Sequence, residues 1–235
     1  MHRQSVRKQI KKLKEVSPYC KYNLFGTKTG RLTTKKNSFP ILTLAKEMRP
    51  VIQPERDFFV SFDFNGAELR TLLALGGSEQ PLEDIHEWNR VNVYRETGSR
   101  EEAKKRLFSW LYNPGSKDQM ANKFYDRDSL VKKHWDGTHV STPYGRLIEV
   151  DKRKALNYLI QSTTSDMVLE QAVKLDCFLE DYKSRIAFII HDEVVLDIDE
   201  EEAHLLPQMK QIFADTRFGT YIVGSKEGSD YGVAA

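Results

Sequence analysis

The pattern of apolar and polar positions divides the chain into short strands and longer helices. Residues 58–62 form an aromatic and β-branched run, which is typical of a strand and leads directly into Asp63. Apolar residues then recur at helical spacing over 67–75, until two glycines end the segment. Asp63 therefore lies between a strand and a helix, and the strand end can hold its side chain in a fixed direction.

Two β-hairpins are predicted in the second half of the chain. Residues 140–150 contain a Pro-Tyr-Gly sequence at 143–145, which is typical of a hairpin turn. Residues 185–190 and 194–198 are apolar runs that flank a polar triplet. The second hairpin is therefore predicted to carry His191, Asp192 and Glu193 at its turn.

Helices are predicted around these strands. Ser99 and Glu102 have the spacing of a capping box, which marks the start of one helix. The predicted helices cover, in chain order, residues 1–16, 67–75, 99–112, 117–135, 152–182 and 200–213. The fifth has an apolar stripe that favours a core position, made of Met167, Val168, Ala172, Val173, Leu175, Phe178 and Leu179. Long helices with a small, antiparallel sheet predict the α+β class.

Composition changes this picture mainly through charge. The 235 residues carry 36 Lys and Arg against 34 Asp and Glu, with 40% apolar residues, which fits one or two ordinary globular domains. Residues 1–36 hold 11 of the basic residues and only Glu15 among the acidic ones, so this head has a net charge of +10 and the remainder −8. Such a head is either a polyanion-binding segment or a solvated basic tail.

Several protein classes are excluded by the same composition. No apolar run approaches the ~20 residues that a membrane span needs, and the head lacks the apolar core of a secretory signal. Cys20 and Cys177 lie far apart without neighbouring Cys or His, which favours a reducing compartment over disulfides or structural zinc. We therefore expect a cytoplasmic protein without membrane contact.

Three acidic residues are candidates for chemistry, because each lies where an apolar strand ends. Asp63, Asp192 and Glu193 would share one site if their strands are neighbours. Carboxylates are the ligands that Mg²⁺ and Mn²⁺ prefer, and two such ions ~4 Å apart promote phosphoryl transfer. Solvated acids at a turn are the alternative.

The helix predicted over 99–112 carries two cations and two aromatic residues at steps of four. Arg100, Lys104, Phe108 and Tyr112 therefore lie along one inclined stripe. Cations that hold a phosphate chain and aromatic rings that stack on a base would explain the stripe. An amphipathic helix with a solvated basic end remains the alternative.

These motifs resemble those of the family A DNA polymerases, the bacterial polymerase I type and its phage relatives. Residues 63–70 are similar to motif A (D-Y-S-x-x-E-L-R), the stripe to motif B (R-x-x-x-K-x-x-x-F-G-x-x-Y-G), and residues 191–193 to motif C. Residues 29–33 resemble the family's T-G-R-L-S segment, and residues 157–162 its N-x-x-I-Q-G segment. The five motifs occur in the family's order, from about Tyr22 to the C-terminus.

The resemblance implies a role for each matching residue at the nucleotide. Asp63 and Asp192 would bind two Mg²⁺ ions, for which Mn²⁺ can substitute, with Glu193 as a supporting acid. Arg100, Lys104 and His86 would contact the triphosphate of the incoming dNTP. Phe108 would stack on the nucleotide, Tyr112 would lie near the templating base, and Glu68 would exclude a ribose 2′-hydroxyl.

The resemblance also implies contacts to DNA and a division of the chain. Primer-template contacts would come from Arg31, Arg153, Asn157, Gln161 and His191. Residues 1–36 would form a basic N-terminal segment, residues 37–85 and 157–235 the palm, and residues 86–156 reduced fingers. The fold expected is α+β, a small antiparallel palm sheet backed by helices with a reduced helical fingers subdomain, without a thumb or exonuclease domain.

Some positions depart from the family pattern. Residues 65–67 read Asn-Gly-Ala in place of the usual S-Q-I type of tripeptide, which alters the turn after Asp63. Ser109, Asn113 and Ser162 stand where the family has Gly. A Cβ at Ser109 is expected to stiffen or crowd the helix that covers the nucleotide.

The function expected is that of a template-directed DNA polymerase core, an enzyme that adds dNTPs to a primer 3′-hydroxyl. A second polypeptide that supplies a thumb and exonuclease, or a processivity factor, is an open alternative to action alone. A catalytically silent nucleic-acid-binding subunit that retains the palm is the alternative function. A reverse transcriptase or RNA polymerase on a similar palm is disfavoured by Glu68 and motif B.

Overall fold

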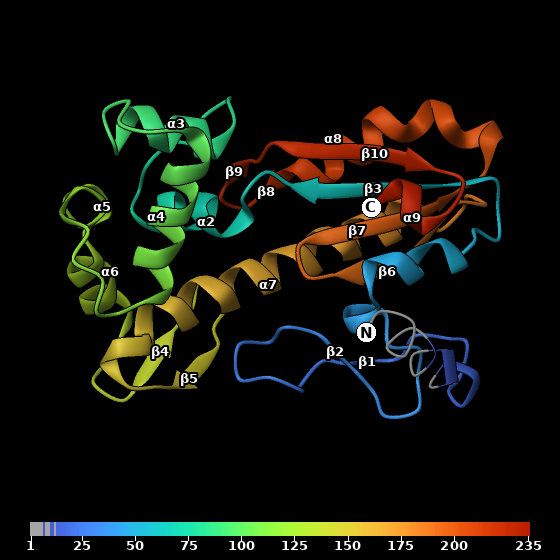
Figure 1. Cartoon of the computed structure of the whole chain (residues 1–235), viewed down its shortest axis with the longest axis horizontal. Coiled ribbons are helices and arrows are strands. Elements are labelled where there is room, and N and C mark those ends of the chain that lie inside the picture. The colour runs from blue at the N-terminus through green and yellow to red at the C-terminus, as the bar shows by residue number, and fades with distance from the viewer. Residues whose placement is uncertain (1–6, 8–9, 12) are drawn as a thin grey trace.

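The structure is a computed structural model that describes residues 7, 10–11 and 13–235. Two lobes lie side by side and are joined by one long helix, α7 (Lys152–Phe178), which runs through both (Figure 1). We call them the sheet lobe and the helical lobe. The sheet lobe is built on strands β3, β6, β7 and β10, and the helical lobe on helices α2 to α6.

The sheet lobe contains a four-stranded, fully antiparallel sheet. Its strand order is β10-β3-β7-β6, with β3 at Phe58–Phe64, β6 at Arg185–Ile190, β7 at Glu193–Ile198 and β10 at Val223–Gly228. In the register of the two central strands, Asp63 lies opposite Glu193 and Phe58 opposite Ile198. The end of β3 and the start of β7, which carry these two acids, therefore lie side by side at the same end of the sheet.

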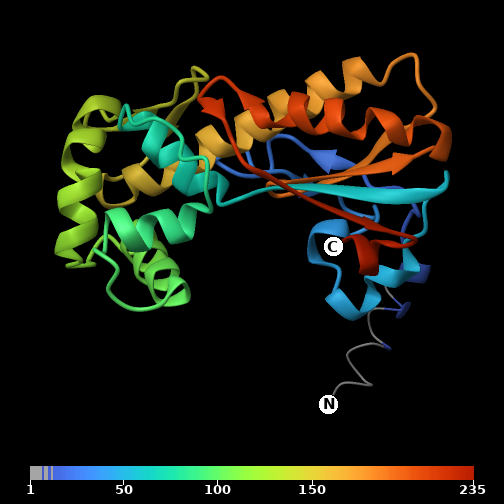
Figure 2. The same ribbon diagram turned by 90° about the horizontal axis from the view of Figure 1, so that it is seen from above.

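Alternating side chains give the sheet two apolar faces. Val60, Phe62 and Phe64 pack with residues of α7 and α8 (Leu206–Ala214), which cover one face together (Figure 2). Phe59 lies on the other face, with η1 (Ile41–Thr43) and α9 (Tyr231–Ala234). Because side chains in a strand alternate between faces, Asp63 lies on the α9 face with Phe59.

The helical lobe has a core of its own. Its elements are α2 (Ala67–Leu75), α3 (Ile85–Asn92), α4 (Arg100–Tyr112), α5 (Gln119–Tyr125), α6 (Arg127–His134) and the hairpin of β4 (His139–Ser141) and β5 (Leu147–Glu149). Leu72, Leu107 and Trp110 are fully buried there. The capping box of α4 is present, because the Glu102 carboxylate accepts from the Ser99 amide at 2.7 Å.

Helix α7 contributes to both cores. Its first half packs Leu156 and Leu159 into the helical lobe, and its second half packs Met167 and Leu175 under the sheet. Between them, Thr164 donates to Thr71 at 3.0 Å and Ser165 to the Gly30 carbonyl at 3.1 Å. The helix therefore fixes the position of the helical lobe relative to the end of the sheet that carries Asp63.

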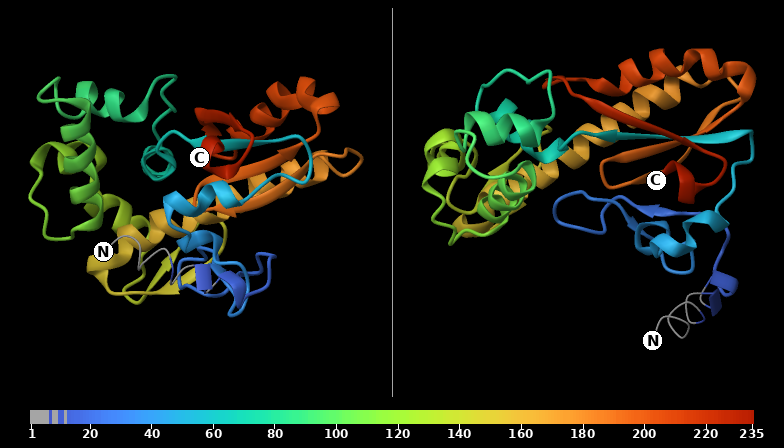
Figure 3. Two further views of the ribbon diagram at one scale, coloured as in Figure 1. Left: turned by 45° about the vertical axis from the view of Figure 1, so that its right-hand side comes forward. Right: turned by 45° about the horizontal axis from the view of Figure 1, so that its top comes forward.

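Residues 20–39 and the remaining short elements complete the sheet lobe. Residues 20–39 follow the sheet lobe along its β6 edge (Figure 3), where the Tyr22 hydroxyl donates to the carbonyl of Ile189 at 2.6 Å and accepts from its amide at 2.9 Å. The other short elements are β1 (Tyr22–Asn23), β2 (Thr33–Thr34), η2 (Lys46–Val51), η3 (Glu200–Leu205), β8 (Asp215–Thr216) and β9 (Gly219–Thr220). Tyr22 thus satisfies backbone groups of a strand that would otherwise be an open edge.

The predicted α+β class, the central strand, both hairpins and the helices over 67–75 and 99–112 are confirmed. The helix predicted over 117–135 is wrong, because Asp126 has a positive φ of 45° and separates α5 from α6. The Asp126 carboxylate accepts from the Ser129 amide at 3.2 Å and so begins α6. Local capping therefore breaks a segment whose composition is helical throughout.

Four further expectations need correction or stay open. Helix α7 ends at Phe178 and not at residue 182, and Val173, placed in its apolar stripe, is 62% exposed. Glu193 belongs to strand β7, so only His191 and Asp192 form the turn. The edge strand β10 was not predicted, and the helix predicted over 1–16 falls largely outside the described residues. None of the described helices is long and apolar enough to cross a membrane.

Candidate active site

The acidic residues of β3 and of the β6–β7 turn lie together at one end of the sheet. Asp63 and Glu193 are direct cross-strand partners, and Asp192 precedes Glu193 in the turn. Partial burial and the charges of Asp192 and Glu193 raise the pKa of Asp63 to about 7, against the opposing effect of Lys226 and Lys104. The three carboxylates are therefore close enough to repel one another.

Glu193 is held by the protein itself. Its carboxylate accepts a hydrogen bond from the Ser61 hydroxyl at 2.5 Å and another from the Tyr231 hydroxyl at 3.3 Å. Ser61 and Tyr231 belong to β3 and α9, so this carboxylate is directed toward the α9 side of the sheet. This arrangement suits a supporting acid better than a ligand with unused oxygen positions.

The turn that carries Asp192 has an unusual backbone. His191 has φ 56°, in the left-handed region that residues with a Cβ rarely adopt. A two-residue turn between β6 and β7 requires such a conformation, because it matches the twist of the strands. Burial raises the pKa of Asp192, while His191 and Arg31 oppose the shift.

A cleft beside this turn brings together several of the predicted residues. Arg31, Glu68, Gln161, His191 and Asp192 all line it. They come from the N-terminal segment, α2, α7 and the β6–β7 turn, which are far apart in the sequence. One predicted catalytic residue, the predicted sugar-discriminating residue and three of the five predicted DNA-contacting residues thus share one cleft.

The carboxylate of Glu68, in the same cleft, has two hydrogen-bond partners. Glu68 lies in the first turn of α2, is 9% exposed, and accepts hydrogen bonds from the Arg31 guanidinium and the Tyr112 hydroxyl. Burial raises its pKa, whereas Arg31 opposes that shift. Glu68 therefore links the N-terminal segment to the end of α4.

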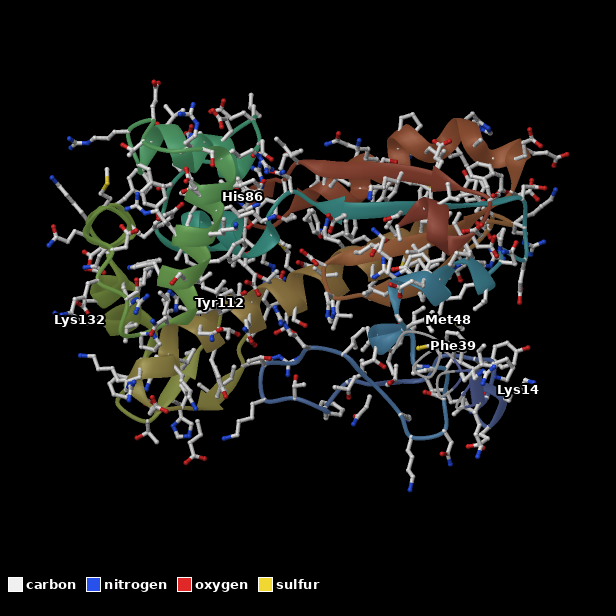
Figure 4. All side chains as sticks on the ribbon, in the orientation of Figure 1. Lys14, Phe39, Met48, His86, Tyr112 and Lys132 are labelled. Carbon is white, nitrogen blue, oxygen red and sulfur yellow. The ribbon has the colours of Figure 1, made fainter. Side chains whose placement is uncertain are left out.

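The predicted stripe on α4 exists and extends to α3. The rings of Phe108 and Tyr112 are stacked with centroids 5.9 Å apart and planes inclined by 9°, and the His86 ring lies 5.9 Å from Phe108. Figure 4 shows His86 and Tyr112 toward opposite ends of α4. The aromatic side chains thus form a continuous row along one side of the helix.

The cationic half of the stripe surrounds His86. Burial together with the charges of Lys104 and Arg100 lowers the pKa of His86 to about 4, so the imidazole is neutral at pH 7. Lys104 also opposes the raised pKa of Asp63, so its charge acts on both Asp63 and His86. The buried Nδ1 atom of His86 has no hydrogen-bond partner among the described residues.

Arg100 is not directed into open solvent. It forms a two-point ion pair with Asp84, in which Nε donates to Oδ1 at 2.9 Å and Nη2 donates to Oδ2 at 2.8 Å. Its Nη1 atom donates to Glu101 at 2.5 Å. Sequence reasoning gave Asp84 no role, although its position before His86 made it the natural cap of α3.

The remaining predicted DNA contacts lie at the start of α7. Arg153 and Asn157 line a second cleft with Tyr112 and Lys152, away from the carboxylates. Asn157 and Gln161 are one helical turn apart, so α7 leads from this cleft to the first one. The structure therefore distributes the predicted DNA contacts over two clefts, to both of which α7 contributes residues.

The oxygen atoms of Asp63 and Asp192 are of the kind that holds a divalent cation. Among the described residues, no three His, Cys, Asp or Glu side chains form a metal-binding cluster. Mg²⁺, however, is commonly held by one or two carboxylates with substrate phosphates and water as further ligands. Asp63 and Asp192 fit that pattern, because a cation between them would offset their mutual repulsion.

Sequence reasoning missed two residues of the site besides Asp84. Lys226 opposes the raised pKa of Asp63 from strand β10, and its register partner Ser61 donates to Glu193. Asn65, noted only as a departure from the motif A pattern, contacts both Asp84 and α3. Lys226 lies on a strand without apolar alternation, and Asn65 reaches Asp84 and Ile85 across 19 and 20 positions, so the sequence pattern indicated neither role.

Comparison with known proteins gives two findings. No family model matches the chain. The thermostable DNA polymerase I of Thermus aquaticus is 22% identical in an alignment 244 residues long, gaps included, which covers 81% of this chain and 29% of that protein. The chain therefore spans less than a third of that relative.

The solved structures add a match of fold. The POL domain of Pol1 from M. smegmatis, in complex with DNA primer-template and dNTP, superposes with a TM-score of 0.76 at 18% identity. The match covers 99% of this chain and 52% of that chain. Together with the curated relative, it confirms that the chain resembles the palm and fingers region of the family A DNA polymerases.

Proposed function

We propose that the chain catalyses template-directed addition of dNTPs to a primer 3′-hydroxyl. The observation that carries this proposal is that Asp63 and Asp192 lie together at one end of the sheet, with Asp63 in electrostatic range of Lys104 on α4. Phosphoryl transfer asks a protein mainly to position its reactants and to neutralise charge. Carboxylates facing a cationic helix meet both requirements.

Asp63 and Asp192 would hold two divalent cations in this proposal. When bound, Mg²⁺ or Mn²⁺ would favour attack by an oxygen nucleophile and stabilise the charge of a leaving group. Glu193 supports the pair from β7, where Ser61 and Tyr231 orient it. The positive charge of the cations would therefore offset the repulsion between the carboxylates of Asp63 and Asp192.

The nucleotide would bind along the stripe of α4. Lys104 and Arg100 supply positive charge for a triphosphate, and His86 offers a neutral imidazole beside them. Phe108 presents a ring on which the nucleotide can stack, with Tyr112 behind it toward the templating base. Glu68, fixed by Arg31 and Tyr112, would occupy the position next to the sugar and exclude a 2′-hydroxyl.

The primer-template would follow the two clefts. Arg31, Gln161 and His191 would contact it beside the carboxylates, and Arg153 and Asn157 at the start of α7. In this proposal residues 37–85 and 157–235 act as the palm, residues 86–156 as reduced fingers, and residues 1–36 as a basic segment that holds DNA phosphates. A second polypeptide that contributes further grip on the duplex is compatible with this arrangement.

A second candidate function is a nucleic-acid-binding subunit without catalysis. It is favoured by the ion pair of Arg100 with Asp84 and by the occupied carboxylate of Glu68, which leave two nucleotide-binding side chains engaged within the protein. Under this alternative the clefts bind DNA while the carboxylates bind no catalytic cation. The two candidates differ in whether Asp192 matters for nucleotide addition.

Primer extension with purified chain, Mg²⁺ and all four dNTPs tests the proposal. Asp192→Asn is expected to abolish extension while the protein stays folded. Asp176→Asn is the matched control, because it removes the same charge from an exposed position on α7. Undiminished extension by Asp192→Asn would overturn the site assignment, and DNA binding without extension by the unaltered chain would favour the second candidate.

A further inference from the structure

The side chain of Asn65 bridges three parts of the candidate site. Its Oδ1 accepts from the Ile85 amide at 2.7 Å and from Arg70 at 3.2 Å, and its Nδ2 donates to Asp84 Oδ2 at 2.7 Å. Asn65 comes two residues after Asp63, in the turn from β3 to α2. One amide group therefore connects the carboxylate end of β3 to the start of α3.

Arg70 makes the turn around Asn65 rigid. It is fully buried and donates to the carbonyl groups of Asn65, Pro81 and Glu83 at 2.8 to 2.9 Å. A buried guanidinium is tolerated only when its donors are satisfied. The backbone on both sides of the Asn65 amide is therefore fixed by the same side chain.

Asp84 receives hydrogen bonds from three elements at once. Oδ1 accepts from the amides of His86 and Glu87 at 3.0 and 2.9 Å and from Arg100 Nε at 2.9 Å. Oδ2 accepts from Asn65 and from Arg100 Nη2 at 2.8 Å. The carboxylate caps α3 and also holds the first residue of α4.

The geometry at Arg100 leaves one end of its guanidinium available. Asp84 occupies the Nε and Nη2 side, whereas Nη1 contacts only Glu101, whose side chain is 61% exposed. An exposed ion pair of this kind contributes little and is readily replaced. A phosphate can therefore take the place of Glu101 while Asp84 keeps Arg100 oriented.

We propose that Asn65 is a positioning residue for nucleotide binding, which acts by holding Asp84 in the orientation that directs Arg100 toward a triphosphate. The inference rests on the proposed function, since it assigns a role within that same site. A serine, which the motif A pattern has at this position, has one short hydroxyl and cannot reach both Ile85 and Asp84. The amide thus supplies a connection that the related pattern does not contain.

The first test is steady-state primer extension with Asn65→Ser. We expect the KM for dNTP to rise roughly 10-fold, as for loss of one hydrogen bond to a charged group, while kcat changes less than about 2-fold. Asn92→Ser is the matched control, because Asn92 is exposed at the other end of α3 and caps only its own helix. An unchanged KM for Asn65→Ser would overturn the proposal.

A second variant isolates the donor of the amide. Asn65→Asp keeps the size and both accepted hydrogen bonds but sets an oxygen against Asp84 Oδ2. At pH 8 we expect its KM to rise at least as much as that of Asn65→Ser. A KM equal to that of the unaltered chain would show that the contact with Asp84 is not needed.

A double-mutant cycle with Arg100→Ala separates positioning from general destabilisation. If Asn65 acts through Arg100, Asn65→Ser causes no further rise of KM once Arg100 is absent. Full additivity would overturn the proposal and leave Asn65 with a structural role alone.

The positioning role of Asn65 and the proposed function can be overturned separately. If the unaltered chain extends no primer, the proposed function fails, and equilibrium titration with dNTP replaces KM in the same cycle. Hydrogen exchange of the Ile85 amide then measures directly its hydrogen bond to Asn65, and we expect faster exchange in Asn65→Ser. Equal nucleotide affinity across the variants would overturn the positioning role under either readout.

Discussion

Tyr112, the last residue of α4, donates a hydrogen bond to Glu68 in the first turn of α2. Arg31 occupies the other oxygen of the same carboxylate. The position of Glu68 is therefore set from two sides, by the helix that would cover the nucleotide and by the segment that would contact the primer. Discrimination between sugars would then depend on α4 as well as on Glu68 itself.

Glu68→Ala is expected to relax the preference for dNTP over rNTP. Removal of the side chain opens space for a 2′-hydroxyl, and a steric difference of this size supports a change of roughly 10- to 200-fold. Tyr112→Phe keeps the ring stacked on Phe108 but releases one side of Glu68, so we expect a smaller change in the same direction. The ratio of kcat/KM for dATP and ATP measures both, and equal ratios in all three proteins would contradict the role of Glu68.

The facing carboxylates of Asp63 and Glu193 should lower the free energy of unfolding when no cation is bound. Like charges directly opposite in an antiparallel pair are destabilising, so Asp63→Asn is expected to raise the free energy of unfolding by roughly 0.2–1 kcal/mol in EDTA. Mg²⁺ should raise the Tm of the unaltered chain through binding to the folded state, but not that of Asp63→Asn. Thermal unfolding with and without Mg²⁺ measures both effects, and identical Mg²⁺ responses would contradict the metal assignment.

His86 should make the stability of the protein depend on pH below neutrality. Its pKa falls from the ordinary histidine value of 6.5 to about 4 in the folded protein, so the unfolded chain binds the extra proton first. The contribution of neutral His86 to the free energy of unfolding is fully present above pH 6.5 and is lost as the pH falls toward 4. The free energy of unfolding then falls by no more than about 1.4 kcal/mol for each pH unit. Denaturant unfolding at several pH values should show a shallower decline for His86→Gln, and parallel curves would contradict this.

The basic head should contribute to DNA affinity through its charge. Residues 2–16 carry six Lys and Arg, and each phosphate contact adds about 0.9 to the slope of log affinity against log salt for duplex DNA. Deletion of these residues is expected to weaken binding and to flatten that slope. A full-length control with the six residues changed to Gln separates charge from chain length, and an unchanged slope in both would identify the head as a solvated tail.

Much of the fold could be predicted because local signals agree with the tertiary contacts. The aromatic run in β3 and the capping box at Ser99 specify their elements within a few residues. The strand β10 could not be predicted, since Gly224, Ser225, Lys226 and Glu227 are exposed at a sheet edge and show no apolar alternation. Its strand conformation comes from pairing with β3, which is a non-local cause.

The candidate site divides in the same way. Asp63, Asp192 and the α4 stripe could be found because their spacing within short motifs follows strand ends and helical turns. The partners of these residues could not, because Asp84 meets Arg100 across 16 positions and Arg31 meets Glu68 across 37. The pairing of these charges depends on the tertiary fold, and the sequence pattern does not indicate it.

Helix α7 supplies apolar side chains to both cores. In its middle, Thr164 donates a hydrogen bond to Thr71 of α2, and Ser165 donates one to the carbonyl of Gly30. Melting of the helix on either side would remove buried contacts from both lobes. We therefore regard the lobes as one cooperative folding unit, so that a chain cut within 156–175 should yield fragments that fold only when recombined.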